Sequence, residues 1–157
     1  MSELKRLPGR GVPRLERALN GRDPEQSAGA ARALVSLGRD VVPPALYVQA
    51  LVLALADPDG LGRRSAIAAL RRVGAGTRMD VARALGLHGP GAVPALVELL
   101  RDKDTGVRRA AVAELARLGP AAKDAVPELR RLRGENGKDA ALVLGIDEAI
   151  RKIEGGG

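Results

Sequence analysis

The residues of this chain that could carry chemistry are mainly arginines. The 157-residue sequence contains 26 Lys and Arg, of which 21 are Arg, against 19 Asp and Glu, and its formal net charge is +7. It contains no Cys, so zinc–thiolate sites, iron–sulfur clusters and thiol catalysis are excluded. His88 is the single histidine, which excludes any site built from two imidazoles. The remaining chemistry is the binding of carboxylates or phosphates by guanidinium groups.

Two acidic turns resemble the start of a calcium loop. Asp57 and Asp59 form one Asp-x-Asp motif, and Asp102 and Asp104 form the other. Neither is followed by Glu at the twelfth position of an EF-hand, and too few oxygen ligands follow, so we expect helix capping instead. His88 lies at a predicted helix end with no nucleophile beside it. We therefore predict no metal, no cofactor and no catalytic residue.

An internal repeat organises the elements that must position the arginines. Residues 59–74 align without gaps with residues 104–119, which lie 45 positions later in the sequence. Several of the same residues also match residues 36 positions earlier, between Asp23 and Gly38. A second motif, in which Val is followed by Pro, precedes these segments. It begins at Val12, Val42, Val93 and Val126.

Each repeat unit predicts two helices joined by a turn. Pro suits the first turn of the first helix, and the Asp before the second helix can accept hydrogen bonds from its free N–H groups. Glycines follow the last apolar positions and are expected to cap helix ends in a left-handed conformation. These are Gly38, Gly74, Gly89 and Gly119. An extra short helix is predicted over 78–88, with Thr77 as its N-cap. No segment alternates with period two, so the fold is predicted to be all-α.

The units resemble HEAT repeats, in particular the bacterial HEAT-like class first associated with phycobilin lyases, and residues 92–120 are close to that consensus. The length suits one domain over 1–157. The resemblance covers about residues 10–153 and implies a right-handed α-solenoid of about four helical-hairpin repeats, whose second helices line the concave face. It also implies protein binding far more often than catalysis. The expected repeats cover 11–38, 41–74, 92–119 and 122–153, with the extra helix at 78–88 and a flexible glycine tail at 155–157.

Two Asp–Arg pairs share a spacing of six residues, Asp57 with Arg63 and Asp102 with Arg108. In HEAT arrays such pairs commonly form a ladder between neighbouring repeats. On a helical wheel, Arg108 lies at about 100° from Val107, on the shoulder of the apolar face, where its guanidinium can reach a neighbouring carboxylate. We expect a structural role for these pairs, and a charged binding site is the alternative.

A row of arginines is predicted on the opposite side of the second helices, which is the concave side if the resemblance holds. The wheel places Arg109 and Arg117 away from the apolar centre, and the repeat alignment carries this position to the earlier repeats. No acidic residue falls in the row, and Arg forks suit carboxylates and phosphates. The predicted partner-binding residues are Arg32, Arg64, Arg71, Arg72, Arg109 and Arg117.

The sequence thus predicts a non-enzymatic protein-interaction module, an adaptor or scaffold, that binds an acidic partner through this basic face. A nucleic-acid or other polyanion binder is the second hypothesis, and a lyase-type enzyme or accessory factor is the third. A GC-rich bacterial genome would also produce many arginines, which is the competing explanation of the row. The apolar segment 44–56 is expected to be enclosed, and a second partner or oligomer contact through Tyr47 is the alternative.

The sequence shows no sign of a membrane segment. The first residues lack the apolar stretch of a signal peptide. The most apolar region, 41–56, contains Pro43, Pro44 and Gln49 and is shorter than the ~20 residues needed to cross a bilayer. We expect a soluble, cytoplasmic protein.

Overall fold

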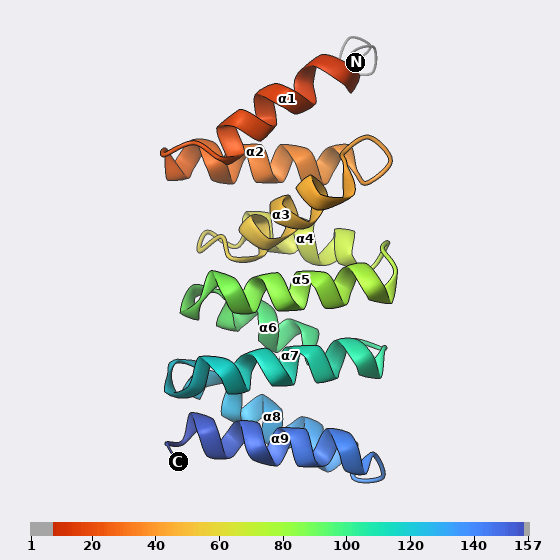
Figure 1. Ribbon diagram of the computed structural model, residues 1–157, viewed down its shortest axis with the longest axis vertical. Helices are drawn as coiled ribbons and strands as arrows, with labels where there is room; N and C mark the ends of the chain where they lie inside the picture. The colour runs from red at the N-terminus through yellow and green to blue at the C-terminus, as the bar shows by residue number, and fades with distance from the viewer. Residues whose placement is uncertain (1–7, 156–157) are drawn as a thin grey trace. The chain divides into compact units, whose positions relative to one another are not determined.

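The computed structural model describes residues 8–155. These residues form helices α1 to α9 and two short 3-10 helices, and none of them lies in a strand (Figure 1). The prediction of an all-helical chain is confirmed. None of the described helices is long and apolar enough to cross a membrane.

The chain divides into two compact units between Val73 and Gly74. In the first unit α1 packs on α2, α2 packs on α3, and α4 contacts both α2 and α3. Its fully buried side chains include Ala31, Leu34, Leu51 and Ala66. The helices are α1 (Pro8–Leu19), α2 (Pro24–Leu37), α3 (Pro44–Leu55) and α4 (Leu61–Leu70).

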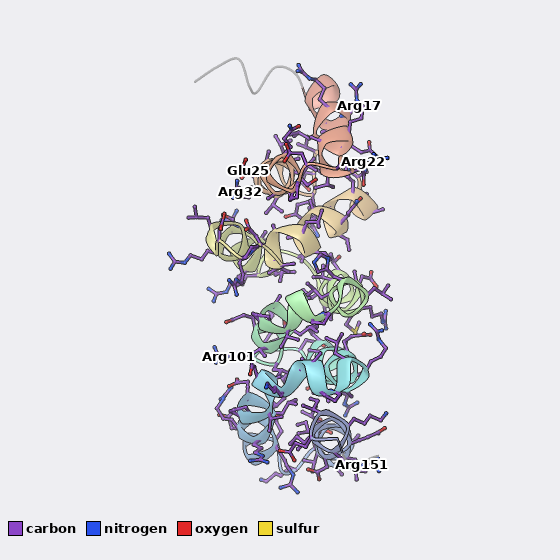
Figure 2. All side chains as sticks on the ribbon, turned by 90° about the vertical axis from the view of Figure 1, so that its left-hand side faces the viewer. Arg17, Arg22, Glu25, Arg32, Arg101 and Arg151 are labelled. Atoms are coloured by element: carbon purple, nitrogen blue, oxygen red, sulfur yellow. The ribbon has the colours of Figure 1, made fainter. Side chains whose placement is uncertain are left out.

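The second unit has two layers. Helices α5, α7 and α9 form one layer, in which α7 packs between the other two. Helices α6 and α8 form the second layer and cover one side of the first. Figure 2 shows Arg101 on the side of α6 and α8 and Arg151 on the side of α9. Leu115 and Leu129 are fully buried in this unit. The elements are α5 (Ala75–His88), η2 (Pro90–Ala92), α6 (Val93–Leu99), α7 (Thr105–Leu118), η3 (Gly119–Ala125), α8 (Val126–Glu135) and α9 (Ala140–Ile153).

Aspartates cap three helices. Asp23 accepts hydrogen bonds from the backbone N–H groups at the start of α2, Asp104 accepts from Val107 at 3.2 Å, and Asp139 accepts from Leu142 at 3.0 Å. The prediction that Asp59 caps α4 in the same way is wrong. The repeat alignment places Gly60 where the later repeat has Thr105, and Gly60 takes a φ of 75° that suits glycine alone, so α4 begins one residue later without a side-chain cap.

Helix α5 begins earlier than the sequence indicates. Gly74 has a φ of −70° and precedes the first residue of α5, so it is an N-cap and not the predicted left-handed C-cap. Thr77 consequently lies inside the first turn and does not cap the helix. The other predicted cap glycines do end helices with positive φ. These are Gly38, Gly89 and Gly119.

Helix α3 is buried on several sides, as its apolar sequence predicts. Most of its circumference is buried, including Leu46, Leu51 and Leu55, Gln49 is exposed, and both α2 and α4 pack against the helix. The ring of Tyr47 belongs to this core, because only 4% of the residue is exposed. The enclosure of segment 44–56 within the first unit therefore accounts for its composition.

We predict that Leu115→Ala lowers the free energy of unfolding by about 2–5 kcal/mol, because it leaves a cavity in a fully buried site. Urea unfolding followed by circular dichroism measures the change. Leu144→Ala is the matched control, since Leu144 is 70% exposed on α9 and its loss should cost less than about 0.5 kcal/mol. Equal effects of the two substitutions would contradict the packing of α7 described above.

Candidate functional site

The exposed face and C-terminal end of α4 carry arginines that no carboxylate neutralises. Ala66 and Leu70 are buried on the inner face of α4, whereas Arg64, Arg71 and Arg72 are exposed. Within residues 8–155, none of these three side chains makes a hydrogen bond or ion pair. We call Arg64, Arg71 and Arg72 the α4 arginine surface.

The charge of the chain is concentrated in the unit that carries this surface. Residues 1–73 contain 12 basic and 7 acidic side chains, whereas residues 74–157 contain 14 and 12. The segment from Leu61 to Val73 contains four arginines and no acidic residue. A local excess of one sign attracts anionic partners and speeds their encounter.

Arg32 belongs to the predicted row but is neutralised within the first unit. Its Nη1 lies 3.3 Å from Oδ2 of Asp57, 25 residues further along the chain. The Asp57 side chain is 3% exposed and that of Arg32 is 39% exposed. This ion pair joins α2 to the turn between α3 and α4, so Arg32 has a structural contact as well as an accessible portion.

The approach of Asp57 to α4 depends on Gly62. A Cβ atom at Gly62 would lie 2.6 Å from Oδ2 of Asp57, too close for a real contact, and at a tight 3.1 Å from the carbonyl oxygen of Ala54. The repeat alignment matches Gly62 with Val107, which is fully buried in α7. The first unit thus has a carboxylate where the second has an apolar side chain.

Arg109 and Arg117 are also paired. Arg109 Nη2 lies 2.9 Å from Oδ1 of Asp139, the residue that caps α9, and Arg117 Nε lies 2.9 Å from Oε2 of Glu114. The backbone N–H of Leu142, together with Arg109, lowers the pKa of Asp139. The side chains of Arg109 and Arg117 are nevertheless 50% and 51% exposed. The predicted row therefore divides into three unpaired and three paired arginines.

The most buried ion pair involves a residue that the sequence interpretation missed. Arg78 Nε lies 2.8 Å from Oδ2 of Asp102, and Arg78 Nη2 lies 3.1 Å from Oδ1. The two side chains are 6% and 11% exposed. The signal was available, because Arg78 shares the apolar face of α5 with Val81, Ala82 and Leu85, where an arginine needs a buried partner.

Arg108, which the sequence predicts to pair with a neighbouring carboxylate, makes no such pair. Arg108 Nη1 donates instead to the carbonyl oxygens of Asp102 and Lys103, at 2.8 and 3.1 Å. Its Nη2 donates to Thr105 Oγ1 at 2.8 Å. Arg63 likewise makes no ion pair with any described residue. The expected ladder is therefore wrong in its arginines, although Asp57 and Asp102 do connect helices distant in sequence.

A second cluster of charges joins the turn that follows α6 to α8. Glu128 lies 2.9 Å from Arg101 Nε and 3.1 Å from Arg131 Nε, and its side chain is 13% exposed. Arg131 also pairs with Glu135. The hydrogen bonds from Arg131 and Arg101 lower the pKa of Glu128 to about 2. This cluster stabilises the carboxylate form of Glu128 and holds the two elements together.

Tyr47 offers a partner little surface. Burial raises the pKa of its hydroxyl, against the opposing effect of Arg72 and Arg39. With 4% of the residue exposed, the ring contributes to the core of the first unit.

The site has the chemistry of a binding surface. His88 is exposed at the end of α5. Nowhere in the described part of the chain do three or more His, Asp or Glu residues gather in an arrangement that could hold a metal ion. What the arrangement can do is bind carboxylates or phosphates through unpaired guanidinium groups.

Comparison with known proteins identifies the repeat. The chain matches the family described as HEAT repeats over residues 48–144. No curated protein and no solved structure matches it.

We predict that Asp102→Asn destabilises the protein by about 3–5 kcal/mol, because the charge of Arg78 then stays buried without a carboxylate. The matched control is Asp80→Asn, which breaks the pair of Asp80 with Arg83, whose side chains are 62% and 63% exposed. That substitution should cost less than about 1 kcal/mol. Urea midpoints measure both, and similar losses would show that burial does not govern the strength of these pairs.

We predict a pH dependence that originates at Glu128. Its folded pKa of about 2 lies below the value of about 4.3 expected in the unfolded chain, so its contribution to stability is complete above that value and is lost as the pH falls toward 2. Glu128→Gln should therefore flatten the loss of stability between about pH 4.5 and 2. Glu16→Gln, which alters an exposed residue of α1, should retain the wild-type slope. A wild-type slope in Glu128→Gln would contradict this assignment.

Proposed function

The chain belongs to the HEAT-repeat family, and from this premise we propose that it is an interaction module that binds an acidic segment of another protein through the α4 arginine surface. HEAT repeats are generally protein-interaction scaffolds, and the family is typically non-enzymatic. The proposal assigns the partner's chemistry and the residues that contact it, which the family alone does not specify.

The observation that carries the proposal is the contrast between paired and unpaired arginines. Arg32, Arg78 and Arg109 lie within hydrogen-bond distance of carboxylates on elements 24 to 30 residues away. Arg64, Arg71 and Arg72 are exposed and have no such partner among the described residues. Other exposed arginines of the first unit, such as Arg14 and Arg22, also lack a carboxylate partner, but Arg64, Arg71 and Arg72 are grouped in a segment without acidic residues, and this grouping favours them as the site for an external anion. The exposed parts of Arg32, Arg109 and Arg117 are secondary contacts in this proposal.

An acidic protein segment is favoured over nucleic acid by the lack of accessible aromatic rings. Single-stranded nucleic acids are commonly bound by stacking of bases on aromatic side chains. Tyr47 is the one aromatic residue of the sequence, and it is buried. The backbone of a duplex needs no such rings, so duplex nucleic acid is the second candidate, supported by the excess of basic residues in 1–73.

The family membership also supports the finer architecture inferred from the sequence. We propose about four repeats in a right-handed solenoid, of the bacterial phycobilin-lyase-type subclass. The constant offset of 45 residues between two of the repeats and the consensus-like segment 92–120 support this assignment.

We predict that replacing Arg64, Arg71 and Arg72 together by Glu weakens binding of a fluorescein-labelled polyglutamate peptide by about tenfold or more, measured by fluorescence anisotropy. Three attractive contacts become repulsive, while the buried face of α4 is unchanged. The matched control replaces Arg14, Arg17 and Arg22, which are exposed in the same unit, so that the net charge changes equally. Figure 2 shows Arg17 and Arg22 on the opposite side of this unit from Arg32.

The same variants distinguish the alternatives. Equal weakening by both triple substitutions would show that net charge alone attracts the peptide and would overturn the site. Tighter binding of a random DNA duplex than of the peptide would favour the second candidate. In that case the affinity should fall with salt at a log–log slope of about −0.9 per phosphate neutralised.

A further inference from the structure

A groove between α7 and α9 lies in the second unit, where Arg109 and Arg117 are found. Its volume is about 370 Å³, near the lower end of the range for ligand pockets, which is enough for one or two side chains of a bound segment. Helices α7 and α9 are neighbours in one layer of this unit (Figure 1). None of the contacts described above uses the inside of the groove.

The groove is open because its walls are made of small residues. Ala113 and Ala116 line it from α7, one helical turn apart, and Ala141 and Gly145 line it from α9 at the same kind of spacing. A Cβ atom at Gly145 would meet only Val112 Cγ1, at an ordinary distance of 3.8 Å. Ala113 and Ala141 are exposed. The sequence therefore provides an apolar depression that solvent reaches and that no side chain of its own fills.

Positive charge predominates at the rim. Arg109, Arg117 and Lys152 line the groove together with one carboxylate, Glu148, which pairs with Lys152 at 2.7 Å, and each of these four side chains is about half exposed. The carboxylates paired with the two arginines, Asp139 and Glu114, are 29% and 16% exposed and do not line the groove. Three cations and one carboxylate therefore face an approaching molecule at the groove. An occupant that complements both features has an apolar centre and acidic flanks.

We propose that this groove receives an aliphatic side chain of an acidic partner segment, so that the recognised segment is amphipathic, with a leucine-like anchor flanked by Asp or Glu. The inference rests on the proposed function for its acidic partner and adds the apolar anchor and the place where it binds. The apolar wall supplies affinity through burial, and the basic rim selects segments with acidic flanks.

The test compares two synthetic peptides of equal charge. One carries leucines among glutamates at helical spacing, and in the other alanine replaces each leucine, which preserves helix propensity. The full-length protein should bind the leucine peptide about tenfold more tightly, because one buried leucine is worth more than that factor when fully enclosed. Amide chemical-shift changes should include Ala113, Ala116 and Ala141.

Filling the groove should remove the preference. Gly145→Leu places a side chain in the position of the proposed anchor, so the leucine peptide should then bind no better than the alanine peptide. Gly134→Leu is the matched control, because Gly134 also lies in a helix, is exposed, and has open space where a Cβ atom would lie. Ala113→Glu, at an exposed position of the wall, tests the same site by repelling the acidic flanks if Gly145→Leu fails to fold.

The outcomes separate the two proposals. If both peptides bind equally, and only substitution of the α4 arginine surface weakens them, the groove proposal is overturned while the proposed function stands. If neither peptide binds, both are overturned. If the protein self-associates and Gly145→Leu abolishes that association without affecting either peptide, the occupant is a second copy of the chain and the groove proposal is wrong.

Discussion

The ion pair between Arg78 and Asp102 is the contact on which the second unit most depends. A core without Phe or Trp consists of short aliphatic side chains, so its helices must pack closely and tolerate few polar groups between them. The pair sits among them at 6% and 11% exposure and connects α5 to the turn before α7. Both hydrogen bonds are short enough to hold that turn, and Asp102 also accepts from the N–H of Asp104 at 2.9 Å. The carboxylate of Asp102 therefore holds both the turn before α7 and helix α5 in place.

Similar ion pairs form elsewhere in the chain with other arginines, and they determine which arginines remain without a carboxylate partner. Asp57 pairs with Arg32, Asp139 with Arg109, and Glu128 with Arg101, in each case across 25 to 30 residues. This separation is about one repeat, so each acidic residue neutralises a cation of the preceding segment. The α4 arginine surface has no acidic counterpart among the described residues, so its charge acts outward.

Local patterns in the sequence were sufficient for the helices and for the outward direction of Arg64, Arg72, Arg109 and Arg117, because helical periodicity needs only neighbouring residues. They were insufficient for the pairing of these arginines. Whether Arg109 meets Asp139 depends on how α7 and α9 stack, and no short segment encodes that distance. The predicted cap at the start of α4 was wrong for a local reason, because Gly60 adopts a turn conformation that Thr105 does not take. Arg78 was recognisable from its place on an apolar face, but only if a buried partner had been sought.

Gly62 links the stability of α4 to the occupancy of its surface. The first turn of α4 lies close to the Asp57 carboxylate at the position where α7 has buried Val107, so this turn has less apolar anchoring than the first turn of α7. The mutual repulsion of the clustered arginines also opposes docking of the helix. A ligand that neutralises them binds the docked helix and raises its local free energy of opening by mass action. Protection of the α4 amides against hydrogen exchange therefore reports directly on whether the surface is occupied.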